Sequence, residues 1–304
     1  MSLLTNWLES LSYELEISEA CSKKKSPLST CTACMDECPH GALIIEDGIL
    51  KLDEKACSLC GICITVCPQQ AIKGQSPARK VIKDHLLLQD DSPLPSFLEL
   101  LYFHKKGVRF IQKEARDKEL EKRIGNANEV FNIMELDPIL ITKTISLKED
   151  AQPKLSRRGF FTKLSMDGKR TVLSSVTPVK WRFNEDSFKS SNLYNDWSLH
   201  EVRIHEKKCT LCEACFNICS AQIFTLENDT LHIDEKNCSG CKLCMDICQH
   251  SGIQVAQSIH KVSEAAYHVY KNECTTCRSS FYSWEEESNE CEICKKIEKP
   301  NFFL

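Results

Sequence analysis

The sequence predicts an α+β protein made of two small cysteine-rich modules, a small central α/β domain and a C-terminal cysteine-containing hairpin. Its 304 residues are enough for two or three domains. Its 20 cysteines fall into two groups of eight and one group of four. Residues 76–150, between the larger groups, contain no cysteine and alternate between helix-like and strand-like patterns.

Composition and charge argue against several classes of protein. No stretch reaches 18 consecutive apolar residues, so we expect no membrane span. Residues 1–22 are acidic and lack the basic and apolar regions of a secretory signal. We therefore expect a cytoplasmic protein, in which cysteines are metal ligands more often than disulfide partners. A formal charge of −4 gives no excess of positive charge to attract nucleic acid.

Residues 1–20 predict an N-terminal amphipathic helix. Apolar residues recur there at helical spacing: Leu4, Trp7, Leu8, Leu11 and Leu15. We expect this helix to pack on its own module, and docking on a partner subunit is the alternative.

The two larger groups of cysteines define modules at residues 21–75 and 205–258. The cysteines of the first module are Cys21, Cys31, Cys34, Cys38, Cys57, Cys60, Cys63 and Cys67. Those of the second are Cys209, Cys212, Cys215, Cys219, Cys238, Cys241, Cys244 and Cys248. Each group divides into two halves, and three of the four halves read C-x2-C-x2-C-x3-C, starting at Cys57, Cys209 and Cys238.

This spacing is typical of iron–sulfur ligands. Three cysteines on a tight loop hold three irons of one cubane, and the fourth cysteine ligates the neighbouring cluster. A tetrahedral zinc usually takes two pairs of cysteines from separate loops, so four cysteines this close together favour a cubane.

The two modules also match each other between their halves. Eighteen residues separate Cys38 from Cys57, and eighteen separate Cys219 from Cys238. Both stretches predict a short hairpin, at residues 42–52 and 223–233. The sequence therefore contains a duplicated module.

Each module resembles a bacterial-type ferredoxin domain with two [4Fe–4S] clusters, and the chain as a whole resembles a polyferredoxin. The resemblance implies a pseudo-symmetric fold of short hairpins and helices around the two clusters. In the first module it implies ligand sets of Cys38, Cys57, Cys60 and Cys63, and of Cys21, Cys31, Cys34 and Cys67. In the second it implies sets of Cys209, Cys212, Cys215 and Cys248, and of Cys219, Cys238, Cys241 and Cys244.

The first half of the first module departs from this pattern. Leu28 occupies the position expected for the first cysteine, and Cys21 lies ten positions before Cys31. We expect Cys21 to be a ligand on an enlarged loop. The alternative is a free Cys21 beside a three-cysteine site, which would favour a [3Fe–4S] cluster or a labile fourth iron.

Residues 76–150 predict a small α/β domain with parallel strands. Ser96 is positioned to cap one helix, and a second helix is expected at 117–134. Strands are expected at 108–111 and 139–145. The domain has no glycine-rich nucleotide motif, so we expect no nucleotide cofactor there. The simplest role for it is a spacer that sets the distance and angle between the modules.

Residues 151–204 read as a basic linker, or alternatively as a dock for an acidic redox partner. The segment Ser156–Lys163 matches the twin-arginine export consensus, but its internal position argues against export. The same segment resembles, weakly, the start of the accessory ferredoxin of periplasmic nitrate reductases. That resemblance implies an accessory role for a molybdenum oxidoreductase.

Residues 259–304 predict a zinc-ribbon-like hairpin. Its four cysteines form two C-x2-C pairs, thirteen residues apart: Cys274, Cys277, Cys291 and Cys294. This spacing suits a structural zinc that replaces the core such a short segment lacks. Iron bound as in rubredoxin, or no metal, are the alternatives.

The sequence predicts an electron carrier rather than an enzyme. It shows no nucleophile motif and no fingerprint for a flavin or a nicotinamide. The leading hypothesis is a protein or subunit that relays single electrons through four [4Fe–4S] clusters to or from a cytosolic oxidoreductase. The partner classes considered are formate dehydrogenases, hydrogenases and molybdenum reductases.

Two further hypotheses belong to other classes. The chain could be an accessory or maturation factor for a molybdenum oxidoreductase, in which clusters help to assemble the partner. It could also be a redox sensor that uses a labile cluster at the Cys21 half.

Overall fold

The computed structural model describes residues 15–46, 48–77, 79–90, 92–143 and 189–297. These residues form two compact units. The first unit contains residues 33–44 and 51–143, together with 15–18, and the second contains residues 19–32, 45–50 and 189–297. The segment Ser156–Lys163 and most of the helix expected at 1–20 lie outside the described residues.

The cysteine-rich part of the first unit is built from very short elements. Strand β1 (Glu16–Ile17) pairs antiparallel with β4 (Ile72–Lys73), so the helix expected over residues 1–20 does not include these two residues. Helices α3 (Ala33–Asp36) and α4 (Ile62–Val66) contact each other. The hairpin expected at 42–52 is present, and its strands are β2 (Leu43–Glu46) and β3 (Ile49–Leu52); residues 45–50 of this hairpin belong to the second unit.

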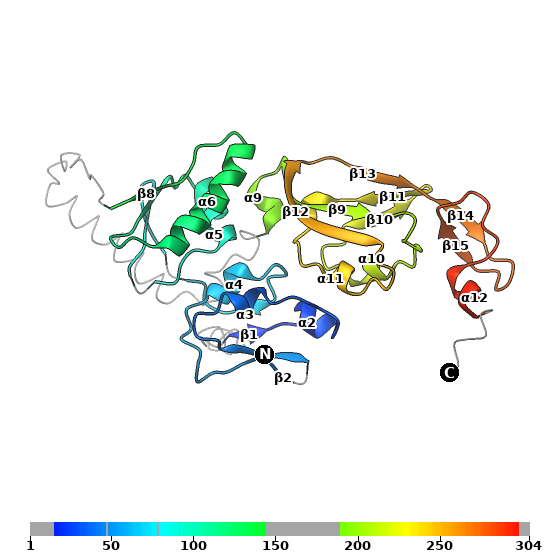
Figure 1. The fold of residues 1–304 in the computed structure, drawn as a ribbon, viewed down its shortest axis with the longest axis horizontal. Coiled ribbons are helices and arrows are strands. Elements are labelled where there is room, and N and C mark those ends of the chain that lie inside the picture. Colours follow the sequence, from blue (N-terminus) through cyan, green and yellow to red (C-terminus); the bar gives the residue numbers. More distant parts are fainter. Residues whose placement is uncertain (1–14, 47, 78, 91, 144–188, 298–304) are drawn as a thin grey trace, which may run out of the picture. The chain divides into compact units, whose positions relative to one another are not determined.

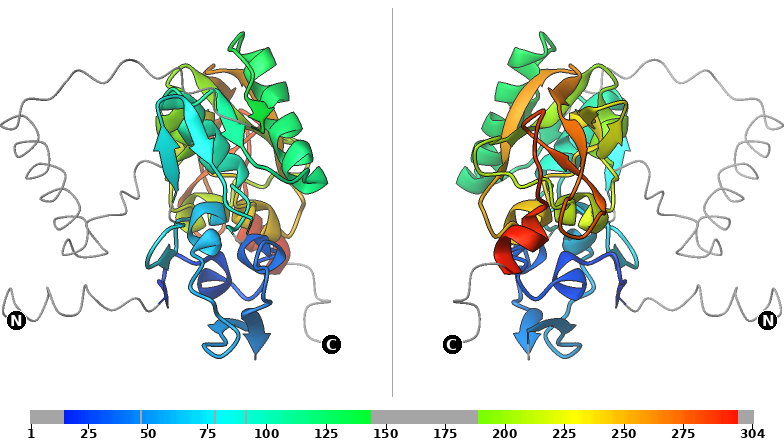
Figure 2. Two further views of the ribbon diagram at one scale, coloured as in Figure 1. Left: turned by 90° about the vertical axis from the view of Figure 1, so that its left-hand side faces the viewer. Right: turned by 90° about the vertical axis from the view of Figure 1, so that its right-hand side faces the viewer.

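The central domain is a four-stranded sheet with two helices, and α6 runs alongside the sheet (Figure 1; Figure 2). The strands, in spatial order, are β5 (Lys80–Ile82), β6 (His85–Leu87), β7 (Phe110–Gln112) and β8 (Leu140–Thr142). Strands β6, β7 and β8 are parallel, as the sequence predicts, and β5 adds an antiparallel edge. The helices are α5 (Phe97–Lys105) and α6 (Lys118–Ile133).

Both helices begin at the residues expected from the sequence. Ser96 Oγ accepts a hydrogen bond from the Glu99 amide, and the Glu99 carboxylate accepts one from the Ser96 amide, which completes a capping box. The Asp117 carboxylate accepts from the Leu120 amide at the start of α6. Helix α5 ends before Gly107, whose φ of 95° is accessible without strain only to glycine.

A buried ion pair joins the central domain to the helix that carries Cys63. The Glu99 carboxylate of α5 accepts bonds of 2.9 and 3.0 Å from the Arg79 guanidinium and one of 3.2 Å from Thr65 Oγ1 of α4. The side chains of Arg79 and Glu99 are 5% and 2% exposed, so this bidentate pair is shielded from water. The pair fixes the position of α4 relative to α5.

Besides the C-terminal hairpin, the second unit contains two sheets and several short helices. Its elements are α2 (Ser22–Lys25), α9 (Ser190–Leu193), β9 (Trp197–Ile204), α10 (Ala214–Ile218), β10 (Phe224–Glu227), β11 (Thr230–Ile233), η2 (Glu235–Asn237), α11 (Leu243–Asp246), β12 (Ile253–Lys261) and β13 (Ala265–His268). Strand β9 pairs with β12, and β10, β11 and β13 form a three-stranded antiparallel sheet. Helices α10 and α11 lie side by side below these strands in Figure 1.

Residues 151–204 were expected to form a linker, but the last eight of them form strand β9 (Trp197–Ile204). Strand β9 pairs antiparallel with β12, placing Val202 opposite Val255 and Ile204 opposite Ile253, and all four side chains are buried. Strand β13, which lies beyond residue 258, likewise completes the sheet of the second module. The second module therefore extends beyond its cysteine motifs on both sides, to β9 before them and to β13 after them.

The chain ends in a small hairpin made of β14 (Tyr270–Glu273) and β15 (Ser280–Ser283), followed by α12 (Glu292–Ile297). The hairpin predicted from the terminal cysteines is thus present. We call residues 270–297 the ribbon.

We predict that Glu99→Ala lowers the free energy of unfolding by about 3 kcal/mol, because the buried Arg79 guanidinium would lose its counter-charge. Urea unfolding of the anaerobically purified protein, followed by circular dichroism, measures this. Glu121→Ala is the matched control, since its pair with Arg116 is largely exposed to solvent and contributes little to stability. Equal losses in the two variants would contradict the structural role given to Glu99.

Candidate metal centres

Three of the four cysteine loops share one unusual backbone conformation. In each loop, the residues on both sides of the second cysteine have positive φ: Leu59 and Gly61, Leu211 and Glu213, Gly240 and Lys242. Alternation between right- and left-handed residues turns successive backbone N–H groups toward one point and forms a concavity that binds anions. Iron–sulfur clusters are among the anionic groups that such concavities bind.

The first half of the first module lacks this feature. Thr30 and Thr32 flank Cys31, and neither has positive φ. The departure that the sequence shows at Leu28 therefore extends to the conformation of the loop.

The fourth cysteine of every half lies in the same turn. The third residue after this cysteine has positive φ in all four halves and donates its backbone N–H to the cysteine carbonyl: Gly41, Gln70, Gln222 and Ser251. In three halves, the backbone N–H of the fourth residue after this cysteine donates a hydrogen bond of 3.2 to 3.3 Å to the cysteine sulfur. The donors are Ala42, Ala71 and Gly252. Such hydrogen bonds orient the sulfur and help to set a cluster's reduction potential.

In the first unit, four cysteines lie close enough to interact electrostatically. Burial raises the pKa of the Cys63 thiol to about 12, and the nearby Cys60, Cys38 and Cys57 contribute to this rise. These four residues are one of the ligand sets that the ferredoxin resemblance implies.

In the second unit, burial and the neighbouring Cys209, Cys212 and Cys248 raise the pKa of Cys215 to about 12. Together with Cys215, these residues form another of the implied sets. Burial of these thiols in apolar surroundings makes the thiolate form unfavourable unless a cation is present.

The remaining four cysteines of the second module also interact with one another. Burial raises the pKa of Cys238 to about 12, and the neighbouring Cys241 and Cys219 add to this effect. The pKa of Cys244 is raised by burial and then by Cys238 and Cys241. Cys219, Cys238, Cys241 and Cys244 form the second ligand set that the ferredoxin resemblance implies for this module.

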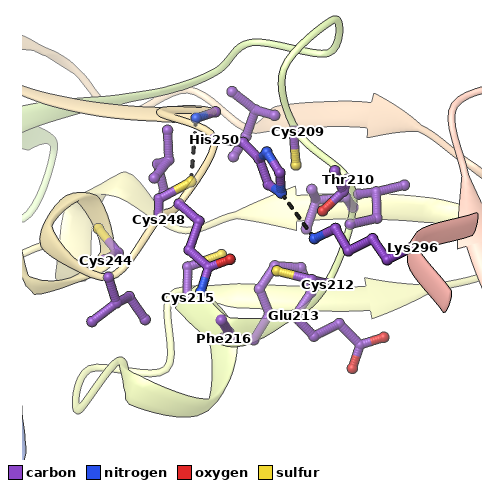
Figure 3. Close-up of a pocket in the computed structure, with 18 residues that line it drawn as sticks. Cys209, Thr210, Cys212, Glu213, Cys215, Phe216, Cys244, Cys248, His250 and Lys296 are labelled. Atoms are coloured by element: carbon purple, nitrogen blue, oxygen red, sulfur yellow. Dashed lines mark hydrogen bonds between the residues drawn. The ribbon is translucent and has the colours of Figure 1, made fainter. Parts of the chain in front are cut away.

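A cavity of about 270 Å³ lies between the sulfurs of Cys209, Cys212, Cys215 and Cys248 (Figure 3). Its other walls are mainly apolar and include Leu211, Phe216, Ile247 and Ile253. An apolar shell of this kind limits solvent access to a cluster and influences its potential. The number of sulfurs, the left-handed loop and the shape of the cavity fit a [4Fe–4S] cluster.

Gly252 allows the loop that carries Cys209 to approach closely. A Cβ atom at position 252 would lie 2.8 Å from Cys209 Cα and 2.9 Å from its nitrogen, both backbone atoms. Sequence reasoning missed this residue, because the equivalent positions of the other halves hold Ala42, Ala71 and the large Ile223 and so show no common preference.

Two polar residues at the same cavity were also missed. His250 and Lys296 line it, and their nitrogens lie 3.4 Å apart (Figure 3). Lys296 comes from α12 of the ribbon, far from the cluster motif in sequence, so no local pattern could have identified it.

Cys21 and Cys31 belong to the second unit, whereas Cys34 and Cys67 belong to the first. The segment around Cys21 makes polar contacts within the second unit. Thr30 donates from its amide and its hydroxyl to the Asp246 carboxylate, both over 2.8 Å.

The ribbon brings the four terminal cysteines together. Their sulfurs all lie within 4.8 Å of one another, and the sulfurs of Cys277 and Cys291 are 3.8 Å apart. Metal–sulfur bonds of about 2.3 Å in a tetrahedron place sulfurs about 3.8 Å apart, so the site fits a tetrahedral metal. A site of four sulfurs suits zinc and also iron.

Hydrogen bonds prepare part of this site for metal binding. The backbone N–H groups of Cys291 and Cys277 lower the pKa of Cys274 to about 6. Burial and the neighbouring cysteines raise the pKa of Cys294. All four sulfurs can therefore be thiolates together only when a cation neutralises them.

No helix in the part of the chain that the structure describes is both long enough and apolar enough to span a bilayer.

Comparisons with known proteins agree with the cysteine motifs. Residues 50–73 match the family of 4Fe–4S binding domains. One component of the ion-translocating oxidoreductase complex from Methanosarcina acetivorans is 40% identical over 43 residues, which are 14% of this chain and 16% of that protein. Pyruvate synthase subunit PorD from Thermotoga maritima is 46% identical over 44 residues, which are 14% of this chain and 44% of PorD.

These matches confirm the resemblance to ferredoxin-type proteins and support an iron–sulfur electron-transfer role. The chain spans less than half the length of either curated relative. Both relatives are named as subunits, one of an oxidoreductase complex and the other of pyruvate synthase.

We predict that Gly252→Ala removes about four iron atoms per chain, since the added methyl group would displace the Cys209 loop. Metal analysis after anaerobic purification measures this. Gly125→Ala on α6 is the control, because an added Cβ there meets no atom within 4 Å and alanine favours a helix. Full iron content in Gly252→Ala would contradict the close approach described here.

Proposed function

We propose that the chain is an electron-transfer protein or subunit that relays single electrons through four [4Fe–4S] clusters to or from an oxidoreductase partner. The observation that carries this proposal is the recurrence of one cysteine-bearing backbone: a left-handed loop in three halves and the same final turn in all four. Zinc sites of four sulfurs do not require this backbone, whereas cubane clusters use it.

The proposed ligand sets follow the motifs. One cluster of residues 21–75 is assigned to Cys38, Cys57, Cys60 and Cys63. Its neighbour is assigned to Cys21, Cys31, Cys34 and Cys67. The clusters of residues 205–258 are assigned to Cys209, Cys212, Cys215 and Cys248, and to Cys219, Cys238, Cys241 and Cys244. The electrostatic neighbours of Cys63, Cys215, Cys238 and Cys244 support three of these sets.

Contacts within the second unit place the segment that carries Cys21 and Cys31 next to the cysteine loops of the second module. Thr30 precedes Cys31 and donates to Asp246, which lies in α11 two residues after Cys244. Lys25 donates to the hydroxyl of Ser220, the residue after Cys219. Loop residues next to proposed ligands of one module thus contact residues next to proposed ligands of the other.

The substrate chemistry is assigned to a partner. The matched relatives are subunits of redox complexes, so we propose that this chain also delivers electrons to, or takes them from, a larger oxidoreductase. We further propose that the ribbon holds a structural zinc, because its four sulfurs all lie within 4.8 Å of one another.

A reductive titration tests the relay. Each cubane takes up one electron, so we expect about four electrons per chain, returned in full to a one-electron acceptor. Cys60→Ser and Cys212→Ser should each lower the count by about one, and Ser58→Ala, in the same loop as Cys60, should leave it unchanged. Absence of reversible reduction in a protein that retains its iron would contradict the proposal.

A second prediction concerns Cys21. If this residue holds a cluster, Cys21→Ser loses between about one and four iron atoms per chain. Leu28→Ala is the control, because Leu28 is 62% exposed at the position where a first cysteine would stand. Unchanged iron in Cys21→Ser, or a [3Fe–4S] signal in the oxidised wild-type protein, would show that Cys21 is not a ligand and would favour the sensor hypothesis.

A further inference from the structure

A hydrogen bond to one backbone oxygen connects the ribbon to the candidate cluster site. The indole Nε1 of Trp284 donates a 2.7 Å hydrogen bond to the carbonyl oxygen of Cys209, 75 residues earlier in the chain. Cys209 is the first cysteine of its motif and lines the cavity of about 270 Å³. A tryptophan just after β15 therefore holds the start of a cysteine loop in another part of the second unit.

Trp284 is itself held in place by the core of the second module. Its ring packs edge-to-face on Tyr267 of β13, with centroids 6.2 Å apart. The Tyr267 hydroxyl accepts a hydrogen bond from the amide of Ile204 at the end of β9. The indole is thus fixed on one side by the sheets and on the other by the Cys209 carbonyl.

The Cys209 segment is confined from several directions. Its amide donates to the His205 carbonyl over 2.8 Å, and Gly252 permits close contact with its backbone. A cleft of about 440 Å³ lies on the ribbon side of Cys209 and Thr210, and Trp284 and Tyr282 line it. Cys209 therefore lies between the cluster cavity and the ribbon.

The last helix of the ribbon also reaches the cavity. Lys296 of α12 lines it beside His250, with the two side-chain nitrogens 3.4 Å apart (Figure 3). Helix α12 has six residues and carries Cys294, so the terminal metal site connects the helix to the hairpin. A helix this short is not stable alone in water, and a metal bound by Cys291 and Cys294 would hold it in place.

We propose that the ribbon is a metal-dependent cover for the cluster held by Cys209, Cys212, Cys215 and Cys248, and that Trp284 is the positioning residue that transmits the effect. This inference rests on the proposed function, because it assigns a cluster to that cavity. With metal in the terminal site, α12 and β15 are ordered, the Cys209 carbonyl is held, and Lys296 stays at the cavity. Without that metal, this one cluster becomes accessible and labile.

The test measures the rate at which an iron chelator removes iron from the anaerobic, fully loaded protein. In Trp284→Phe the aromatic ring remains but the N–H donor is lost. We expect about four of the roughly sixteen iron atoms to leave about five-fold faster, the effect of losing one hydrogen bond. Trp197→Phe on β9 is the matched control and should release iron at the wild-type rate.

Two further variants identify the cluster and the metal. Cys212→Ser combined with Trp284→Phe should lack the fast phase, because the cluster concerned is absent. Cys291→Ala, which breaks the terminal site, should show the same fast phase as Trp284→Phe. Equal acceleration of all iron atoms, or wild-type rates in both Trp284→Phe and Cys291→Ala, would overturn the proposal.

Amide hydrogen exchange separates failure of this inference from failure of the proposed function. We expect faster exchange over residues 209–216 in Trp284→Phe, whereas exchange in α6 stays unchanged. Wild-type exchange over residues 209–216 would refute the role of Trp284. Purified protein that contains no iron would refute the proposed function, and the exchange measurement still tests the Trp284 contact in that case.

Discussion

The structure depends above all on the burial of cysteine thiols close to one another. Burial and neighbouring sulfurs hold the pKa values of Cys63, Cys215 and Cys238 near 12, so clusters of thiolates do not form there without cations. The helices between these cysteines have only four or five residues. Helices this short are not stable alone, so metal binding and folding are coupled in the cysteine-rich parts of the chain.

The other elements support these metal centres. In the first unit, the Glu99–Arg79 pair and Thr65 hold α4, which carries Cys63, against the central domain. In the second unit, β9 and β12 form a ladder behind the cysteine loops, and the ribbon contacts Cys209 through Trp284. The central domain, expected from the sequence to be a spacer, thus also braces a helix that carries a candidate ligand.

Much of this arrangement could be predicted from local sequence. The cysteine spacing predicted the loops because cluster ligands must lie close together along the chain. Ser96 predicted the start of α5 because helix capping involves only neighbouring residues, and the range expected for the second helix, 117–134, begins at the residue that caps α6. Strand β9 was missed because its partner β12 lies about 50 residues away and the ladder is interrupted between Gln257 and His260. The bond from Trp284 to the Cys209 carbonyl was missed because any residue offers the same backbone acceptor.

The central claim is that two pairs of cubane clusters occupy the cysteine-rich modules and that a separate metal occupies the ribbon. The most direct test is to purify the protein without oxygen, measure iron, sulfide and zinc per chain, and record the EPR spectrum of the reduced form. We expect about sixteen iron, about sixteen sulfide and about one zinc per chain, with spin coupling between paired clusters. Iron near zero with about four or more zinc per chain would contradict it.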